Sequence, residues 1–155
     1  NIAGLEASSV VIPAPALREA MRNALDGAHI NVPNVFAMEA YLAAYTQCDD
    51  YLEQMLPYLW GNICYVEETL KKYMPRIRLI KPEGTYLLWL DGRDLGICDQ
   101  EVINFFVNDC AIAVNPGSLF GPEGACFVRL NIACPRATVE QAMAQMQAAY
   151  TKRGF

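Results

Sequence analysis

The stretch NPGSLFGPEGACFVRLNIACPR, residues 115–136, decides the fold and holds the most informative polar side chain of this sequence. In its run FVRLNI, every second residue is aliphatic, and the residues between them are aromatic or polar. This alternation is typical of a β-strand with one buried face. Val128, Leu130 and Ile132 share the buried face, so Arg129 points to the other. An arginine on a strand beside a glycine-rich loop is well placed to hold a carboxylate or phosphate through its planar fork. An ion pair with a neighbouring Asp or Glu is the structural alternative.

The surrounding sequence predicts an α+β unit over residues 75–155, with a short, mainly antiparallel sheet and helices packed on it. Strands are expected at residues 76–80, 85–90, 111–115 and 126–132. The turn sequence KPEG joins the first two strands. Asp99 is expected to cap one helix, and Thr138 with Gln141 forms a capping box for the last one.

Before residue 75 the sequence predicts a helical arm. A short strand is expected at residues 8–12, followed by helices at 15–27, 34–45 and 49–73. The third helix would extend about 37 Å at ~1.5 Å per residue, long enough to bridge two domains. We therefore divide the chain into residues 1–47, an interdomain helix at 48–74 and a small domain at 75–155.

Composition limits the classes of function. A net charge of −5 argues against nucleic acid and against an anionic membrane surface as partners. No apolar run is long enough to span a bilayer. Six cysteines without CxxC spacing, and a single histidine, predict reduced thiols in the cytoplasm and no metal site. The hydrophobic content of 54% suggests a surface that faces another domain or subunit.

Several blocks of the sequence resemble a known family. KPEGTYLLWLD (residues 81–91), FGPEGACFVRLNIACPR (residues 120–136) and the opening NIAGL are similar to the C-terminal region of class I/II aminotransferase-family enzymes. These are fold-type I enzymes that use pyridoxal phosphate. Within the family, the sequence most resembles the cystathionine β-lyase-like carbon–sulfur lyases, including the maltose-regulon type. The resemblance implies the tail of a large cofactor-binding domain in residues 1–47 and the small C-terminal domain in residues 75–155.

The resemblance also implies how the chemistry is divided. It places the Schiff-base lysine three positions before Asn1, so we expect no catalytic residue and no cofactor contact in this chain, and no activity from the chain alone. The chain looks cut from a longer protein. Many relatives hold the cofactor phosphate with a basic residue at a position where this sequence has Glu6. The intact protein is expected to bind pyridoxal phosphate and an amino-acid substrate, and to form a homodimer.

Three residues are candidates for substrate binding. Arg129 matches the arginine that holds the substrate α-carboxylate in much of this family. Phe120, in the loop beside it, is expected at the mouth of the site. Tyr86 follows the turn at Gly84 and either lines the entrance or is an ordinary packed strand residue.

Three functions remain open from the sequence. The first is β-elimination from cystathionine or cysteine by the intact protein. The second is transamination on the same fold, which these residues do not separate from the first. The third, of a different class, is a free-standing small-molecule-binding or dimerisation module.

Overall fold

The structure, a computed structural model, describes residues 3–30 and 32–155, which divide into two compact units, Asn1–Gln54 and Met55–Phe155. The first unit contains a short 3-10 turn η1 (Ala3–Leu5) and the helices α1 (Pro15–Gly27) and α2 (Ala37–Thr46). Pro15 occupies the first turn of α1, where its fixed φ suits a helix and its missing N–H costs nothing. The predicted helix at residues 15–27 is therefore confirmed.

The strand expected at residues 8–12 does not form, and that prediction is wrong. The segment has no regular secondary structure and pairs with no strand among the described residues, and Val10 and Val11 are exposed. Alternation and β-branched residues favour a strand, yet a strand also requires a neighbour to receive its backbone hydrogen bonds.

The long helix α3 (Asp49–Tyr73) begins in the first unit and supplies one wall of the second. Its side chains Leu59, Ile63, Val66 and Leu70 are buried in the core of the second unit. The predicted bounds of this helix, 49–73, are confirmed.

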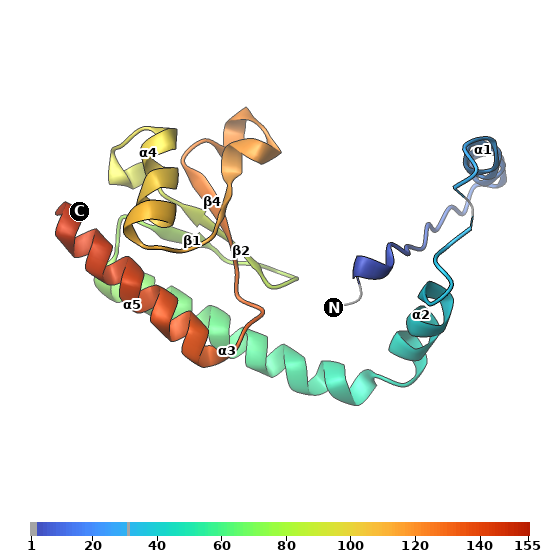
Figure 1. Ribbon diagram of the computed structural model, residues 1–155, viewed down its shortest axis with the longest axis horizontal. Helices are drawn as coiled ribbons and strands as arrows, with labels where there is room; N and C mark the ends of the chain where they lie inside the picture. Colours follow the sequence, from blue (N-terminus) through green and yellow to red (C-terminus); the bar gives the residue numbers. More distant parts are fainter. Residues whose placement is uncertain (1–2, 31) are drawn as a thin grey trace. The chain divides into compact units, whose positions relative to one another are not determined.

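The second unit is built on a four-stranded antiparallel sheet in the order β1-β2-β4-β3 (Figure 1). Its strands are β1 (Arg78–Ile80), β2 (Leu87–Asp91), β3 (Asn115–Pro116) and β4 (Phe127–Asn131). The remaining elements are η2 (Arg93–Leu95), α4 (Asp99–Asn104), which continues as the π-helical turn η3 (Phe105–Asp109), the turns η4 (Gly117–Phe120) and η5 (Pro122–Gly124), and α5 (Arg136–Arg153). The predicted α+β class with a short antiparallel sheet is confirmed.

One face of this sheet carries the hydrophobic core. Leu88 and Leu90 of β2 and Val128 and Leu130 of β4 are buried there against α3, α4 and α5. Helices α3 and α5 run side by side along the sheet (Figure 1). The other face is free of these helices, and its side chains are the alternate residues of the same strands.

Asn62 connects three elements within that core. It is fully buried on α3, and its amide nitrogen donates to the carbonyl oxygens of Ile132 at 3.1 Å and Cys134 at 3.2 Å, just beyond β4. Its amide oxygen accepts a hydrogen bond from Nε of Arg136, at the start of α5, at 2.8 Å. All the polar atoms of this buried side chain are thereby used, which is the condition for placing an amide in a core.

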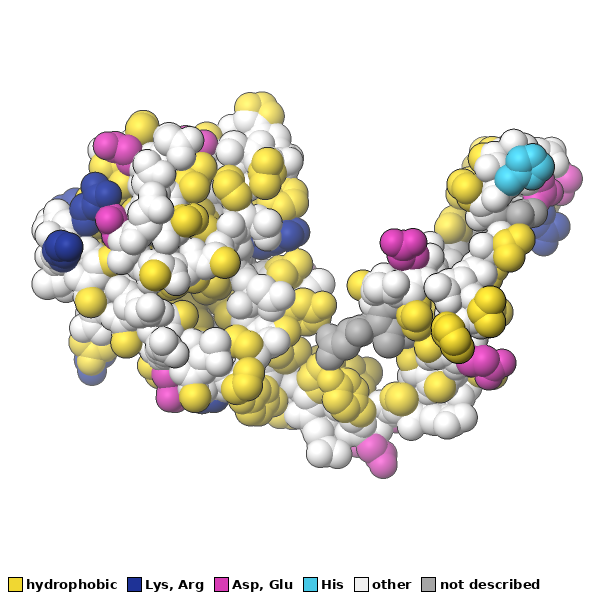
Figure 2. Space-filling view, in the orientation of Figure 1, with side chains coloured by type: hydrophobic (Ala, Val, Ile, Leu, Met, Phe, Trp, Pro, Cys, Tyr) yellow, Lys and Arg dark blue, Asp and Glu magenta, His cyan; other side chains and the backbone are white. Residues whose placement is uncertain are grey.

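Apolar side chains also cover much of the outer surface. Figure 2 shows them over both units, and the most exposed large ones are Val11, Val35 and Val32 of the first unit, at 87%, 86% and 82%. Among the described residues, no helix combines the length and apolar character that crossing a bilayer demands.

Candidate functional site

The candidate site lies on the face of the sheet opposite the core, around Arg129 on β4. Phe127 and Val128 are buried, Arg129 is half-buried and Leu130 is buried. In the sheet register, Arg129 lies between Trp89 of β2 and Asn115 of β3. Residues paired across a sheet share a face, so the three side chains lie side by side.

The guanidinium of Arg129 has two neighbours and one unsatisfied donor. Its Nη2 donates to Oδ1 of Asn115 at 3.0 Å, and its Cζ lies 4.7 Å from the centre of the Phe120 ring. Its Nε is shielded from solvent and has no hydrogen-bond partner. Leaving such a donor unpaired costs about 1–3 kcal/mol, so an anionic group that reaches this nitrogen would be bound favourably.

Three aromatic rings form one wall of the site. The Trp89 ring meets the edge of Phe120 at a centroid distance of 5.6 Å and stacks on Phe127, also at 5.6 Å. Phe120 touches both the guanidinium and this pair, although its side chain remains more than half exposed. The wall covers one side of Arg129 with low-polarity surface, which strengthens the interaction of the guanidinium with an anion.

The loop that carries Phe120 folds back on itself. A Cβ on Gly117 would overlap the carbonyl oxygen of Gly124 and lie 2.8 Å from Cβ of Phe127. Gly121 has φ of 134°, a conformation that other residues rarely adopt. The far end is held by Asp99, whose Oδ1 accepts a hydrogen bond from the backbone N–H of Cys126 at 2.6 Å. The glycines of this loop thus place Phe120 over Arg129.

That contact corrects the expectation for Asp99. The N-cap of α4 is Cys98 and shows no side-chain cap, while Asp99 is the first residue of the helix. Its carboxylate binds the loop instead of its own helix end, because the chain before β4 passes within reach.

A buried ion pair lies at the end of β2. Asp91 is 1% exposed and accepts hydrogen bonds from Arg93 at 2.9 Å and from Nη2 of Arg78 at 3.0 Å. The hydrogen bonds from Arg93 lower the pKa of Asp91 to about 2. Cζ of Arg93 in turn lies 4.8 Å from the centre of the Phe127 ring, so the ion pair contacts one of the three aromatic residues of the wall.

Tyr86 lies elsewhere. It precedes β2, is half-buried, and packs against the core on the helix-covered face, in step with Leu88 and Leu90. Its carbonyl oxygen accepts a hydrogen bond from the backbone N–H of Ile132 at 3.0 Å. The structure therefore brings Arg129 and Phe120 together. It places Tyr86 against the core, as an ordinary packed residue next to a strand.

Asn115 and Trp89 were not singled out from the sequence. The alternation in TYLLWLD indicates that Trp89 and Asp91 share a face, but nothing in it says which strand lies next to β2. The pairing of β4 with both β2 and β3 sets these neighbours, and it follows from tertiary structure.

The lysines are placed away from this site. Lys71 and Lys81 both contact Glu67, at 2.6 and 3.4 Å, Lys72 lies on α3, and Lys152 lies in the last turn of α5. Among the described residues no cluster of His, Cys, Asp and Glu could hold a metal ion. The unpaired Nε of Arg129 is available to an anionic group, and none of the four lysines contributes to its surroundings.

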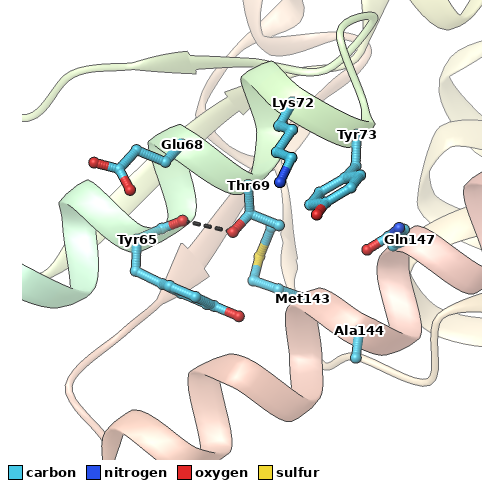
Figure 3. Close-up of a pocket in the computed structure, with 8 residues that line it drawn as sticks. All are labelled: Tyr65, Glu68, Thr69, Lys72, Tyr73, Met143, Ala144 and Gln147. Atoms are coloured by element: carbon cyan, nitrogen blue, oxygen red, sulfur yellow. Dashed lines mark hydrogen bonds between the residues drawn. The ribbon is translucent and has the colours of Figure 1, made fainter.

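A second hollow, of about 400 Å³, lies between α3 and α5 (Figure 3). Two of its polar side chains have partners nearby: Thr69 donates to the carbonyl oxygen of Tyr65 at 2.7 Å, and Nζ of Lys72 lies 4.8 Å from the centre of the Tyr73 ring. It offers a ligand no unsatisfied buried group, in contrast to the surroundings of Arg129.

Comparisons with known proteins find carbon–sulfur lyases and aminotransferases. The chain is 32% identical over 149 residues to cystathionine β-lyase PatB of Bacillus subtilis, covering 96% of this chain and 38% of that protein. It is 34% identical over 145 residues to protein MalY of Escherichia coli, covering 93% and 37%. A crystal structure of a putative aminotransferase from Clostridium difficile, with bound pyridoxal phosphate, superposes with a TM-score of 0.90 at 36% identity, covering 96% of this chain and 38% of that one. No family model matches the sequence.

Proposed function

This chain belongs to the cystathionine β-lyase-like branch of the class I/II aminotransferase family, and on that premise we propose that the intact protein is a β carbon–sulfur lyase. It would use pyridoxal phosphate and act on an amino acid with sulfur on its β-carbon, such as cystathionine or cysteine. The chain spans less than two fifths of the length of PatB, so the activity is proposed for the protein as a whole.

The similarity to cystathionine β-lyase PatB favours a lyase, and the structural observation that supports an amino-acid substrate is the unpaired, solvent-shielded Nε of Arg129 beside the aromatic wall. A guanidinium in this state binds a carboxylate through two parallel hydrogen bonds, which fix the plane of the carboxylate as well as its position. Fixing the α-carboxylate orients the other bonds of the substrate Cα and so selects the one that breaks. Phe120 and Trp89 would keep water from that contact.

The remaining chemistry is assigned to the cofactor and to residues outside this chain. Pyridoxal phosphate, when bound, accepts the electrons released at Cα and so permits the β-sulfur to leave. We propose that the lysine which anchors it is not among the lysines of this chain, since these lie on α3, after β1 and at the end of α5.

An aminotransferase of the same fold is the second candidate. The resemblance to the Clostridium difficile structure, which is described as a putative aminotransferase, favours it. Arg129 would hold the α-carboxylate in either reaction, so this residue does not separate them.

Product analysis on the intact protein separates the two functions. A lyase converts cystathionine and water into homocysteine, pyruvate and ammonia, with no requirement for an added 2-oxo acid. We expect thiol and pyruvate to appear in equal amounts. Product formation that depends on a 2-oxo acid acceptor, without thiol release, would replace the lyase by the aminotransferase.

We further propose that the intact protein is a cytoplasmic homodimer. The exposed apolar side chains of the first unit support a second subunit that covers them. Light scattering on the intact protein should give twice the mass of one chain.

All six cysteines are free, as expected for a protein in the reducing cytoplasm. Burial raises the pKa of the Cys110 thiol to about 12, which keeps this thiol protonated and unreactive.

A further inference from the structure

We propose that Asn115 is a positioning residue that fixes the guanidinium of Arg129 for the substrate carboxylate. The inference rests on the function proposed above. Asn115 is the cross-strand partner of Arg129, and its Oδ1 accepts a hydrogen bond from Nη2 at 3.0 Å. Nothing in the family resemblance assigned this residue a role.

Two contacts together leave the guanidinium little freedom. The Phe120 ring, 4.7 Å from Cζ, limits movement of the group on one side, while the hydrogen bond to Asn115 holds Nη2. A free arginine side chain populates many rotamers, and ordering it on binding would weaken the complex. Here both contacts are made without a ligand, and Nε is still unpaired.

The chemical type of the partner also matters. Arg78, Arg93 and Arg153 pair with carboxylates, at 3.0, 2.9 and 2.6 Å, and their charges are compensated within the protein. Arg129 pairs instead with a neutral amide, so its charge stays available to an anion. An acid at position 115 would hold the guanidinium equally well but would compete with the substrate.

Three variants of the intact protein test the proposal. Asn115→Ala removes the contact, Asn115→Asp keeps an acceptor but adds charge, and Asn131→Ala is the matched control. Asn131 lies two residues along β4 on the same face, but its Oδ1 accepts from the backbone N–H of Ala133 at 2.8 Å. The kinetic readout is kcat/KM for cystathionine and for an analogue that lacks the α-carboxylate. The structural readout is the crystal structure of each protein.

We expect Asn115→Ala to lower kcat/KM for cystathionine about tenfold, mainly through KM, because one hydrogen bond to a charged group is lost. The analogue should be unaffected. Asn115→Asp should lose more than Asn115→Ala, and Asn131→Ala should match the wild type. The Arg129 guanidinium should occupy one position in the wild type and several in Asn115→Ala.

A single Arg129 position in Asn115→Ala, or equal losses on cystathionine and its analogue, would overturn the proposal. If the wild type acts on no amino acid, the proposed function fails instead. The crystal structures then still decide whether Asn115 orders Arg129.

Discussion

At the scale of single residues, Arg129 is the group on which substrate binding is expected to depend. Arg129→Ala in the intact protein leaves a carboxylate without its partner, a loss of about 2–5 kcal/mol. This corresponds to a fall in kcat/KM of about 30-fold to several thousandfold. Arg129→Lys should recover only part of the activity, because an ammonium cannot form two parallel bonds.

The control is turnover of an analogue without the α-carboxylate. The loss should be confined to the carboxylate-bearing substrate, and cofactor absorbance should persist, because Arg129 is not expected to contact the phosphate. Equal losses on both compounds would make Arg129 a structural residue.

Asp91 predicts a pH dependence of stability. Its pKa is lowered in the folded protein to about 2, from 3.8, so its contribution is present above about pH 4 and is lost as the pH falls towards 2. The shift corresponds to about 2 kcal/mol. Asp91→Asn should reduce the free energy of unfolding in urea by about that amount at pH 7, by about half as much at pH 3, and by much less at pH 2.

Asp94→Asn is the matched variant, since Asp94 lies 3.6 Å from Arg78 but is half exposed. We expect it to change stability by less than about 0.5 kcal/mol at either pH. A pH-independent loss in Asp91→Asn would assign its role to packing instead of charge.

The sequence located some residues of the site and missed others for a physical reason. Strand alternation was enough to place Arg129 off the core, and the glycine loop was enough to put Phe120 near it. Asn115 and Trp89 reach Arg129 across the sheet. Which residues face each other depends on register, which is set by the packing of the whole sheet.

At the scale of elements, the loop from η4 to η5 is predicted to be intolerant of added side-chain volume. Gly117→Ala would push a methyl group into the backbone of Gly124 and into Phe127, which moves Phe120 away from Arg129. We expect a loss of kcat/KM of at least tenfold with little change in helix content, measured by turnover and by circular dichroism.

Gly84→Ala is the comparison, because a Cβ there meets nothing within 4 Å. It should leave both quantities unchanged. Wild-type turnover in Gly117→Ala would show that the position of Phe120 does not matter.

Helix boundaries were predicted best where the apolar residues repeat at helical spacing up to a clear start or stop signal. The bounds of α1 and α3 were correct, whereas the capping box at Thr138 and Gln141 was wrong: α5 begins at Arg136, after Pro135, without a side-chain cap. Two contacts hold Arg136 as the first residue of α5: its backbone N–H donates to the Tyr58 hydroxyl at 2.6 Å, and its Nε donates to Oδ1 of Asn62 at 2.8 Å. Such tertiary contacts override a local capping signal. Likewise, Asn115 is the one residue of the expected strand 111–115 that pairs with β4, and the observed strand β3 continues to Pro116, one residue beyond the expected end.

At the scale of the whole molecule, the two units are expected to differ in local stability. No residue of α1 is buried, whereas α5 buries five side chains. In the 155-residue chain, amide hydrogens of α1 should therefore exchange much faster than those of α5, as measured by hydrogen exchange with mass spectrometry. Strong and equal protection of both helices in a chain shown to be monomeric would contradict this expectation.

The hydrogen bonds of Asn62 have a mechanical consequence. They fasten α3 to the backbone immediately after β4, three residues beyond Arg129, and to the first residue of α5. Around Asn62, α3, the end of β4 and the start of α5 are therefore joined through one buried side chain. A displacement of α3 near Asn62 is therefore expected to shift the backbone at Ile132, which is three residues from Arg129 on the same strand segment.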